Sequence, residues 1–210
     1  MTDFRLPDWA VPSEPRATKV VNQKIDIRDQ WWSAEINRLG LDGTPPASPS
    51  LTRAEVWSPD DDVFSLLWRA LAWGSGPHLR NNKRRLDSIA ADPDGARKLL
   101  EAAREEARRD PEGAYQLLMP NGRAAIKYLG PAFFTKFLYF AGGGDPLHRC
   151  LILDERVATS VCDHCGATWF PIRGWYPETY AWYCDQLAQE AKTRDRAADE
   201  IELLLFKGHE

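Results

Sequence analysis

The chain has no long uncharged hydrophobic run: none of its apolar stretches approaches the ~20 residues that a bilayer-spanning helix needs. Its first residues, MTDFRLPDWAVPSEPR, contain acidic side chains and prolines, whereas a secretory signal peptide has a basic start and an apolar stretch. Only four cysteines occur in 210 residues, which is not the pattern of a secreted disulfide scaffold. These absences predict a cytoplasmic protein with no membrane association.

An excess of positive charge is also missing. The formal net charge of −4 argues against a protein that coats nucleic acid non-specifically. The charge is unevenly spread, because residues 51–140 carry 14 basic and 12 acidic side chains, whereas residues 151–210 carry 6 and 11. The first of these regions contains the basic cluster Arg80, Lys83, Arg84 and Arg85, which is either a DNA-contacting face or a solvated helix start.

The regular structure that the sequence predicts is almost entirely helical. The chain is 43% apolar and has nine tryptophans, enough for the core of one domain or of two lobes sharing a cleft. Residues 1–26 read as an extended arm and 40–59 as a loop, and we find neither an internal repeat nor convincing paired strands. Capping and proline signals predict helices over about 28–39, 60–73, 93–109, 111–119, 123–128, from Pro131 onward, after Asp154, 177–192 and 195–206. We therefore expect an all-α protein with an N-terminal arm and short helix over 1–59 and one main domain over 60–210.

A single lysine lies in one of the most apolar helical segments. From Ala132 to Ala141 every residue is apolar or aromatic except Thr135 and Lys136. A helix that is hydrophobic all round is normally buried, and lysine is almost never fully buried without a partner. Burial disfavours the charged form of an amine, and a neutral amine is a nucleophile. The alternative is a lysine whose stem packs while its ammonium group reaches the surface.

An aspartate follows 18 residues after the lysine, in LILDERVA (151–158). The three glycines Gly142, Gly143 and Gly144 stop the lysine helix, so the chain has room to return to the same side. Asp154 stands where an apolar run changes into a short helix, which is the place of an N-cap. We predict that Asp154 caps this helix and also presents its carboxylate to a cleft beside Lys136.

These two segments resemble the helix-hairpin-helix DNA glycosylase superfamily, in particular the 8-oxoguanine DNA glycosylases. In that family a glycine-containing hairpin leads into a helix bearing the catalytic lysine, and a later apolar stretch ends in an aspartate. Gly130-Pro131, Lys136 and Asp154 match these positions. The resemblance covers about residues 60–206 and is strongest over 129–158.

The chain departs from the family pattern at two positions. Tyr128 stands where the hairpin usually has its first glycine, and Ala132 stands where most bifunctional members carry the lysine, about one turn before Lys136. The placement of Lys136 is closer to the archaeal 8-oxoguanine glycosylase branch. The stretch from LLWRALAWGSG (66–76) to Ala158 also resembles a bacterial group with the same fold.

The resemblance implies a DNA-binding surface, a base pocket and a reaction. The implied fold has two helical lobes around a cleft, and the partner is double-stranded DNA with a damaged or modified base, bound by a monomer without a cofactor. Gly130, Pro131 and Lys127 would contact a phosphate together with the basic cluster. Trp73, Gly74 and Phe134 would line the pocket for a flipped base. Lys136 would attack C1′ of the sugar with help from Asp154, and strand cleavage could follow.

The motif CDHCG (162–166) does not fit the glycosylase pattern. Two cysteines at this spacing, here Cys162 and Cys165, form the knuckle of many zinc ribbons, but the chain has no second knuckle. We expect no metal. Two alternatives to the enzyme remain open: a non-enzymatic helix-hairpin-helix DNA-binding module with a cysteine-based zinc knob, and a helical interaction protein.

Overall fold

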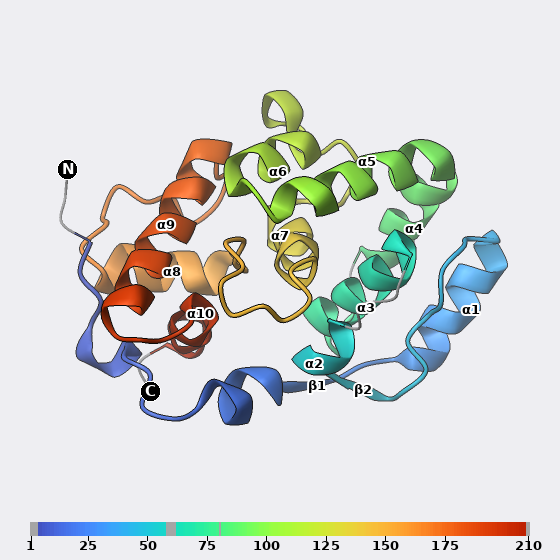
Figure 1. Ribbon diagram of the computed structural model, residues 1–210. Coiled ribbons are helices and arrows are strands. Elements are labelled where there is room, and N and C mark those ends of the chain that lie inside the picture. The colour runs from blue at the N-terminus through green and yellow to red at the C-terminus, as the bar shows by residue number, and fades with distance from the viewer. Residues whose placement is uncertain (1–3, 58–61, 80, 209–210) are drawn as a thin grey trace.

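The computed structural model describes residues 4–57, 62–79 and 81–208, and helices dominate it (Figure 1). This confirms the expected all-α fold class. No described helix is long and apolar enough to cross a membrane. The helices are α1 (Asp29–Leu39), α2 (Arg53–Val56), α3 (Val63–Ser75), α4 (Asn82–Ala90), α5 (Pro93–Ala107), α6 (Pro111–Leu118), α7 (Pro131–Phe140), α8 (Glu155–His164), α9 (Pro177–Thr193) and α10 (Ala198–Lys207), with short helical turns at Asp8–Ala10, Ala17–Val21 and Pro120–Gly122.

Local capping signals explain where several helices begin. The carboxylate of Asp62 accepts hydrogen bonds from the first turn of α3, and Asp92 and Asp110 do the same for α5 and α6. Pro93 and Pro111 occupy the first helical position, where the missing N–H costs nothing. Gly40 ends α1 in the left-handed conformation that favours glycine.

The structure corrects four local predictions. Two three-residue strands, β1 (Lys24–Asp26) and β2 (Ser50–Thr52), form an antiparallel pair, and they are too short to show an alternating pattern. A short helix, α2, follows β2 inside the predicted loop. Residues 123–128 form turns and not a helix. The cap of α10 is Ala197, not Asp195, because the helix begins only at Ala198.

Helix α7 occupies the middle of the molecule (Figure 1). Helices α1, α3 and α4 lie on one side of it and α8, α9 and α10 on the other, while α5 and α6 pack across it. The N-terminal arm runs below both groups, contacts α10 and then pairs with β2 through β1. This arrangement places the lysine helix next to segments from both ends of the chain.

Candidate active site

A cleft of about 240 Å³ contains both predicted catalytic residues in its walls. Lys136 comes from α7, Asp154 from the start of α8, and Trp73 and Gly74 from α3. The arm supplies Gln23 and Ile25, and α10 supplies Glu202 and Phe206. Residues that are remote in sequence therefore share one site.

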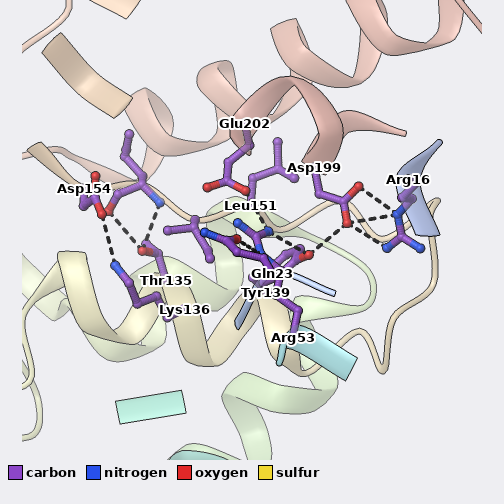
Figure 2. Close-up of polar contacts among 12 residues, drawn as sticks. Arg16, Gln23, Arg53, Thr135, Lys136, Tyr139, Leu151, Asp154, Asp199 and Glu202 are labelled. Atoms are coloured by element: carbon purple, nitrogen blue, oxygen red, sulfur yellow. Dashed lines mark hydrogen bonds and ion pairs between the residues drawn. The ribbon is translucent and has the colours of Figure 1, made fainter. Parts of the chain in front are cut away.

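The amine of Lys136 faces Asp154 inside this cleft (Figure 2). Its Nζ lies 3.2 Å from Oδ2 of Asp154 and donates a hydrogen bond of 2.8 Å to the carbonyl of Ala132. The residue is only 6% exposed, so its stem and head are both enclosed. The structure thus places the amine beside a carboxylate in a cavity instead of directing it to open solvent.

Asp154 has the two roles that its position suggests. As the N-cap of α8 it accepts a hydrogen bond of 3.2 Å from the backbone N–H of Val157 through Oδ1. Its other oxygen pairs with Lys136. The positive end of the α8 dipole stabilises the carboxylate, and the cap limits the directions in which it can turn.

Gly74 leaves room for the lysine side chain. A Cβ atom added to this glycine would lie 2.5 Å from Cδ and 3.1 Å from Cε of Lys136. Real Cβ atoms do not approach other carbons so closely, so the lysine stem crosses α3 where α3 has no side chain. Gly74 was expected to line a base pocket, and it does line the cleft. Within the cleft it lies directly against the side chain of Lys136.

The two aromatic residues of the expected base pocket have different positions. Trp73 lines the cleft, and its ring lies edge-on to that of Phe140, with 5.3 Å between the ring centroids. Its Nε1 has no hydrogen-bond partner within the described structure. Phe134 is fully buried against Tyr115 and is not among the described residues that line the cleft. The expectation for Phe134 is therefore wrong. Successive helical residues point in different directions, and it is Phe133 whose ring lies 5.8 Å from the amine of Lys136.

The predicted hairpin is a tight turn directly before α7. Gly130 is the N-cap of this helix and Pro131 is its first residue. Apart from Gly130 and its two chain neighbours, none of the described residues has a heavy atom within 4 Å of a Cβ added to Gly130. Tyr128, at the place of the usual first glycine, has a φ of 68°. A bulky side chain with positive φ is strained. The Nε of Arg85 donates a hydrogen bond of 2.9 Å to the carbonyl of Tyr128 and so holds this turn.

A comparison with known protein families matches most of the chain. The family described as "Putative 8-oxoguanine DNA glycosylase OGG-like protein" matches residues 18–206. The chain belongs to this OGG-like family. The match includes residues 18–26 of the predicted arm, and this part supplies Gln23 and Ile25 to the cleft. No curated protein and no solved structure matches the chain.

The basic cluster of this OGG-like protein is divided by the fold. Lys83 is exposed and pairs with Asp87 at 2.9 Å. The guanidinium of Arg84 lies 5.6 Å from the ring centre of Tyr128, and the amine of Lys127 lies 5.4 Å from the same ring. Two exposed cations thus meet at the hairpin. Arg80 lies outside the described residues.

Arg85 is a structural residue, and its predicted contact with a phosphate is wrong. It is 4% exposed, and its guanidinium lies 3.6 Å from the ring centre of Phe133. It also donates a hydrogen bond to Oδ1 of Asn82. Burial lowers the pKa of Arg85 to about 10. A run of basic residues in a sequence does not reveal which of their side chains the helix directs into the interior.

Sequence reasoning missed the buried ionic network beside the lysine. Nη1 of Arg53 lies 2.8 Å from Oε2 of Glu202 and 2.9 Å from the hydroxyl of Tyr139, and Nε of Arg53 donates to Gln23 (Figure 2). Arg53 and Glu202 are each 1% exposed and line the cleft. Burial raises the pKa of the Glu202 carboxyl against the opposing effect of Arg53. The two residues are 149 positions apart, and no local pattern could have paired them.

The cysteine motif does not form a metal site in the described part of the chain. Cys165 is fully buried, and burial raises the pKa of its thiol to about 12. The sulfur of Cys162 lies 3.8 Å from the carbonyl of Thr168. Among the described residues, no group of three or more histidine, cysteine, aspartate or glutamate side chains could hold a metal ion.

Proposed function

We propose that this chain is a DNA glycosylase that removes an oxidised or modified base by attack of Lys136 on the sugar. 8-Oxoguanine in duplex DNA is the first candidate substrate. The single observation that carries the proposal is the pairing of Lys136 with Asp154 at 3.2 Å within one cleft. The family membership supports the same class of reaction.

The chemistry follows from the two side chains. Asp154 takes a proton from the ammonium group of Lys136, and the free amine attacks C1′. The glycosidic bond breaks, and the base leaves with the bonding electrons and collects a proton. Opening of the sugar then gives an imine between Nζ and C1′. Asp154 passes the proton that it took to the departing base, and its carboxylate then stabilises the positive charge of the protonated imine. Elimination from the imine would cut the strand.

The cleft suits a flipped base. An enzyme of this class must take the target base out of the stack into a pocket. The ring of Trp73 provides an apolar surface, and Gln23, Arg53 and Glu202 add polar groups to the lining of the same cleft. These residues belong to the arm, α2, α3 and α10, so the pocket requires the whole fold. The side chains supply all of the chemistry, and we expect no cofactor.

The hairpin would hold the DNA. The open space at Gly130 permits close approach of a phosphate to the backbone, and the N-terminus of α7 favours an anion. Arg84 and Lys127 supply exposed positive charge beside it. We expect the chain to bind double-stranded DNA as a monomer through this surface.

Borohydride trapping tests the proposal. The purified chain would be incubated with duplexes that contain one 8-oxoguanine, another damaged base or a modified base, and the imine would be reduced to a stable adduct. We expect Lys136→Gln to abolish the adduct while folding and DNA binding persist. The control is Lys192→Gln, the same change at an exposed lysine of α9. Base release by Lys136→Gln at the unmodified rate would contradict the proposal.

A further inference from the structure

The segment that carries Asp154 has no regular secondary structure of its own. Residues 151–153 are buried and belong to neither a helix nor a strand. Buried backbone groups need hydrogen-bond partners, and here side chains provide them. Tyr180 donates to the carbonyl of Leu151 and Tyr183 to that of Ile152, at 2.8 and 2.9 Å.

Thr135 provides the contact next to the aspartate. Its Oγ1 accepts a hydrogen bond of 3.2 Å from the backbone N–H of Leu153, the residue directly before Asp154. The same hydroxyl lies 3.1 Å from the carbonyl of Leu153 and 2.8 Å from that of Pro131. Thr135 is fully buried and directly precedes Lys136 in α7. Figure 2 shows Thr135 and Lys136 facing the segment that ends in Asp154.

A threonine inside a helix often donates its hydroxyl to the carbonyl four residues earlier, and the bond to Pro131 has this form. That local bond does not explain the acceptor role toward Leu153. Removal of the hydroxyl would leave the N–H of Leu153 without this partner in the interior, where an unsatisfied group is costly. The contact therefore joins two segments and is not only an internal feature of α7.

We infer that Thr135 is a positioning residue, which sets the carboxylate of Asp154 against the amine of Lys136. Helix α7 carries both the amine of Lys136 and, one residue earlier, the hydroxyl that bonds to the backbone just before Asp154. The position of the carboxylate relative to the amine is therefore set by this one helix. This inference rests on the proposed function. A displacement of about 1 Å at such a site can lower a rate about 100-fold.

Three variants test the inference. Thr135→Val removes the hydroxyl at nearly constant shape, and Thr135→Ser retains it. Tyr115→Phe is the matched control, because the Tyr115 hydroxyl is another buried donor to a backbone carbonyl, that of Trp175 at 2.7 Å. The assay is the rate of borohydride-trapped adduct on a duplex with one abasic site, which forms the imine without prior base release. Melting temperature and DNA affinity would be measured in parallel.

We expect Thr135→Val to slow adduct formation by about 10- to 100-fold. Thr135→Ser and Tyr115→Phe should remain near the unmodified rate. Recovery of the rate by the retained hydroxyl of Thr135→Ser, together with an unmodified DNA affinity of Thr135→Val, would distinguish displacement of Asp154 from a loss of folded protein.

A double variant identifies the residue through which Thr135 acts. If Thr135 acts through Asp154, then Thr135→Val should add little to the defect of Asp154→Asn. A slow Asp154→Asn variant together with an unaffected Thr135→Val variant would overturn the inference and leave the proposed function in place. So would independent, multiplicative losses in the double variant. An unmodified chain that forms no adduct would overturn the proposed function and the inference with it.

Discussion

The side chain of Lys136 crosses α3 at Gly74, where an added Cβ would lie 2.5 Å from the lysine Cδ. Gly74→Ala should therefore displace the lysine. We expect adduct formation to fall by about 10-fold or more. Alanine is a better helix former than glycine by about 1 kcal/mol, which offsets the cost of the displacement, so the melting temperature should change little.

The control for this prediction is Gly113→Ala, at a glycine inside α6 whose added Cβ would meet side-chain oxygens of Asp110 and Glu106 at 3.0 Å. It changes helix propensity in the same direction away from the cleft. An active Gly74→Ala variant would show that the lysine can react from another position.

Two substitutions at Asp154 should separate its catalytic role from its role as a helix cap. Asp154→Asn keeps most of the cap but loses the charge, so it should slow base release strongly at little cost in DNA affinity. Asp154→Ala loses both and should also cost about 1 kcal/mol of folding free energy. Single-turnover rates and urea unfolding curves measure the two effects. Equal rates for Asp154→Asn and the unmodified chain would remove the carboxylate from the mechanism.

The basic residues near the hairpin should divide into two classes. Replacing the exposed Arg84 and Lys127 with alanine should weaken binding to all duplexes about equally and flatten the dependence of affinity on salt. Arg85→Ala should instead destabilise the protein, because it removes the buried bond to the carbonyl of Tyr128. Salt titrations by fluorescence anisotropy and thermal melting distinguish them. An unchanged salt slope in the Arg84 and Lys127 double variant would exclude this surface as the DNA contact.

His148 should make stability depend on pH. Burial lowers the pKa of its imidazole, and Nε2 lies 2.8 Å from the carbonyl of Leu138, to which the neutral ring donates. The unfolded chain binds this proton more readily than the folded chain, so stability should fall as pH drops below about 6.5. Unfolding curves between pH 7 and pH 5 measure this. His148→Gln should reduce the slope, and an unchanged slope in this variant would refute the assignment.

Removal of metal should leave the protein folded. A structural zinc site contributes folding free energy directly, so a chelator would lower the melting temperature if one existed. We expect no stoichiometric zinc by elemental analysis and no change in melting with a chelator. Zinc bound through Cys162 and Cys165, lost on conversion of either to serine, would reverse this prediction.

Local patterns in the sequence determined much of the helical framework. Asp92-Pro93 and Asp110-Pro111 predicted the starts of α5 and α6, because a capping carboxylate and an N1 proline act within one helical turn. The same is true of the cap at Asp154. The candidate pair of Lys136 and Asp154 could also be proposed from sequence, since an isolated lysine in an apolar helix is conspicuous.

Only the tertiary structure decided which of these groups meet and which are enclosed. The contact of Gly74 with Lys136, the pairing of Arg53 with Glu202 and the bond from Leu153 to Thr135 each join separate segments of the chain. Arg84 and Arg85 are neighbours in sequence, yet one is exposed at the hairpin and the other is buried under it. Helical periodicity limits the directions of side chains, but the packing of one helix against another decides which direction is the interior.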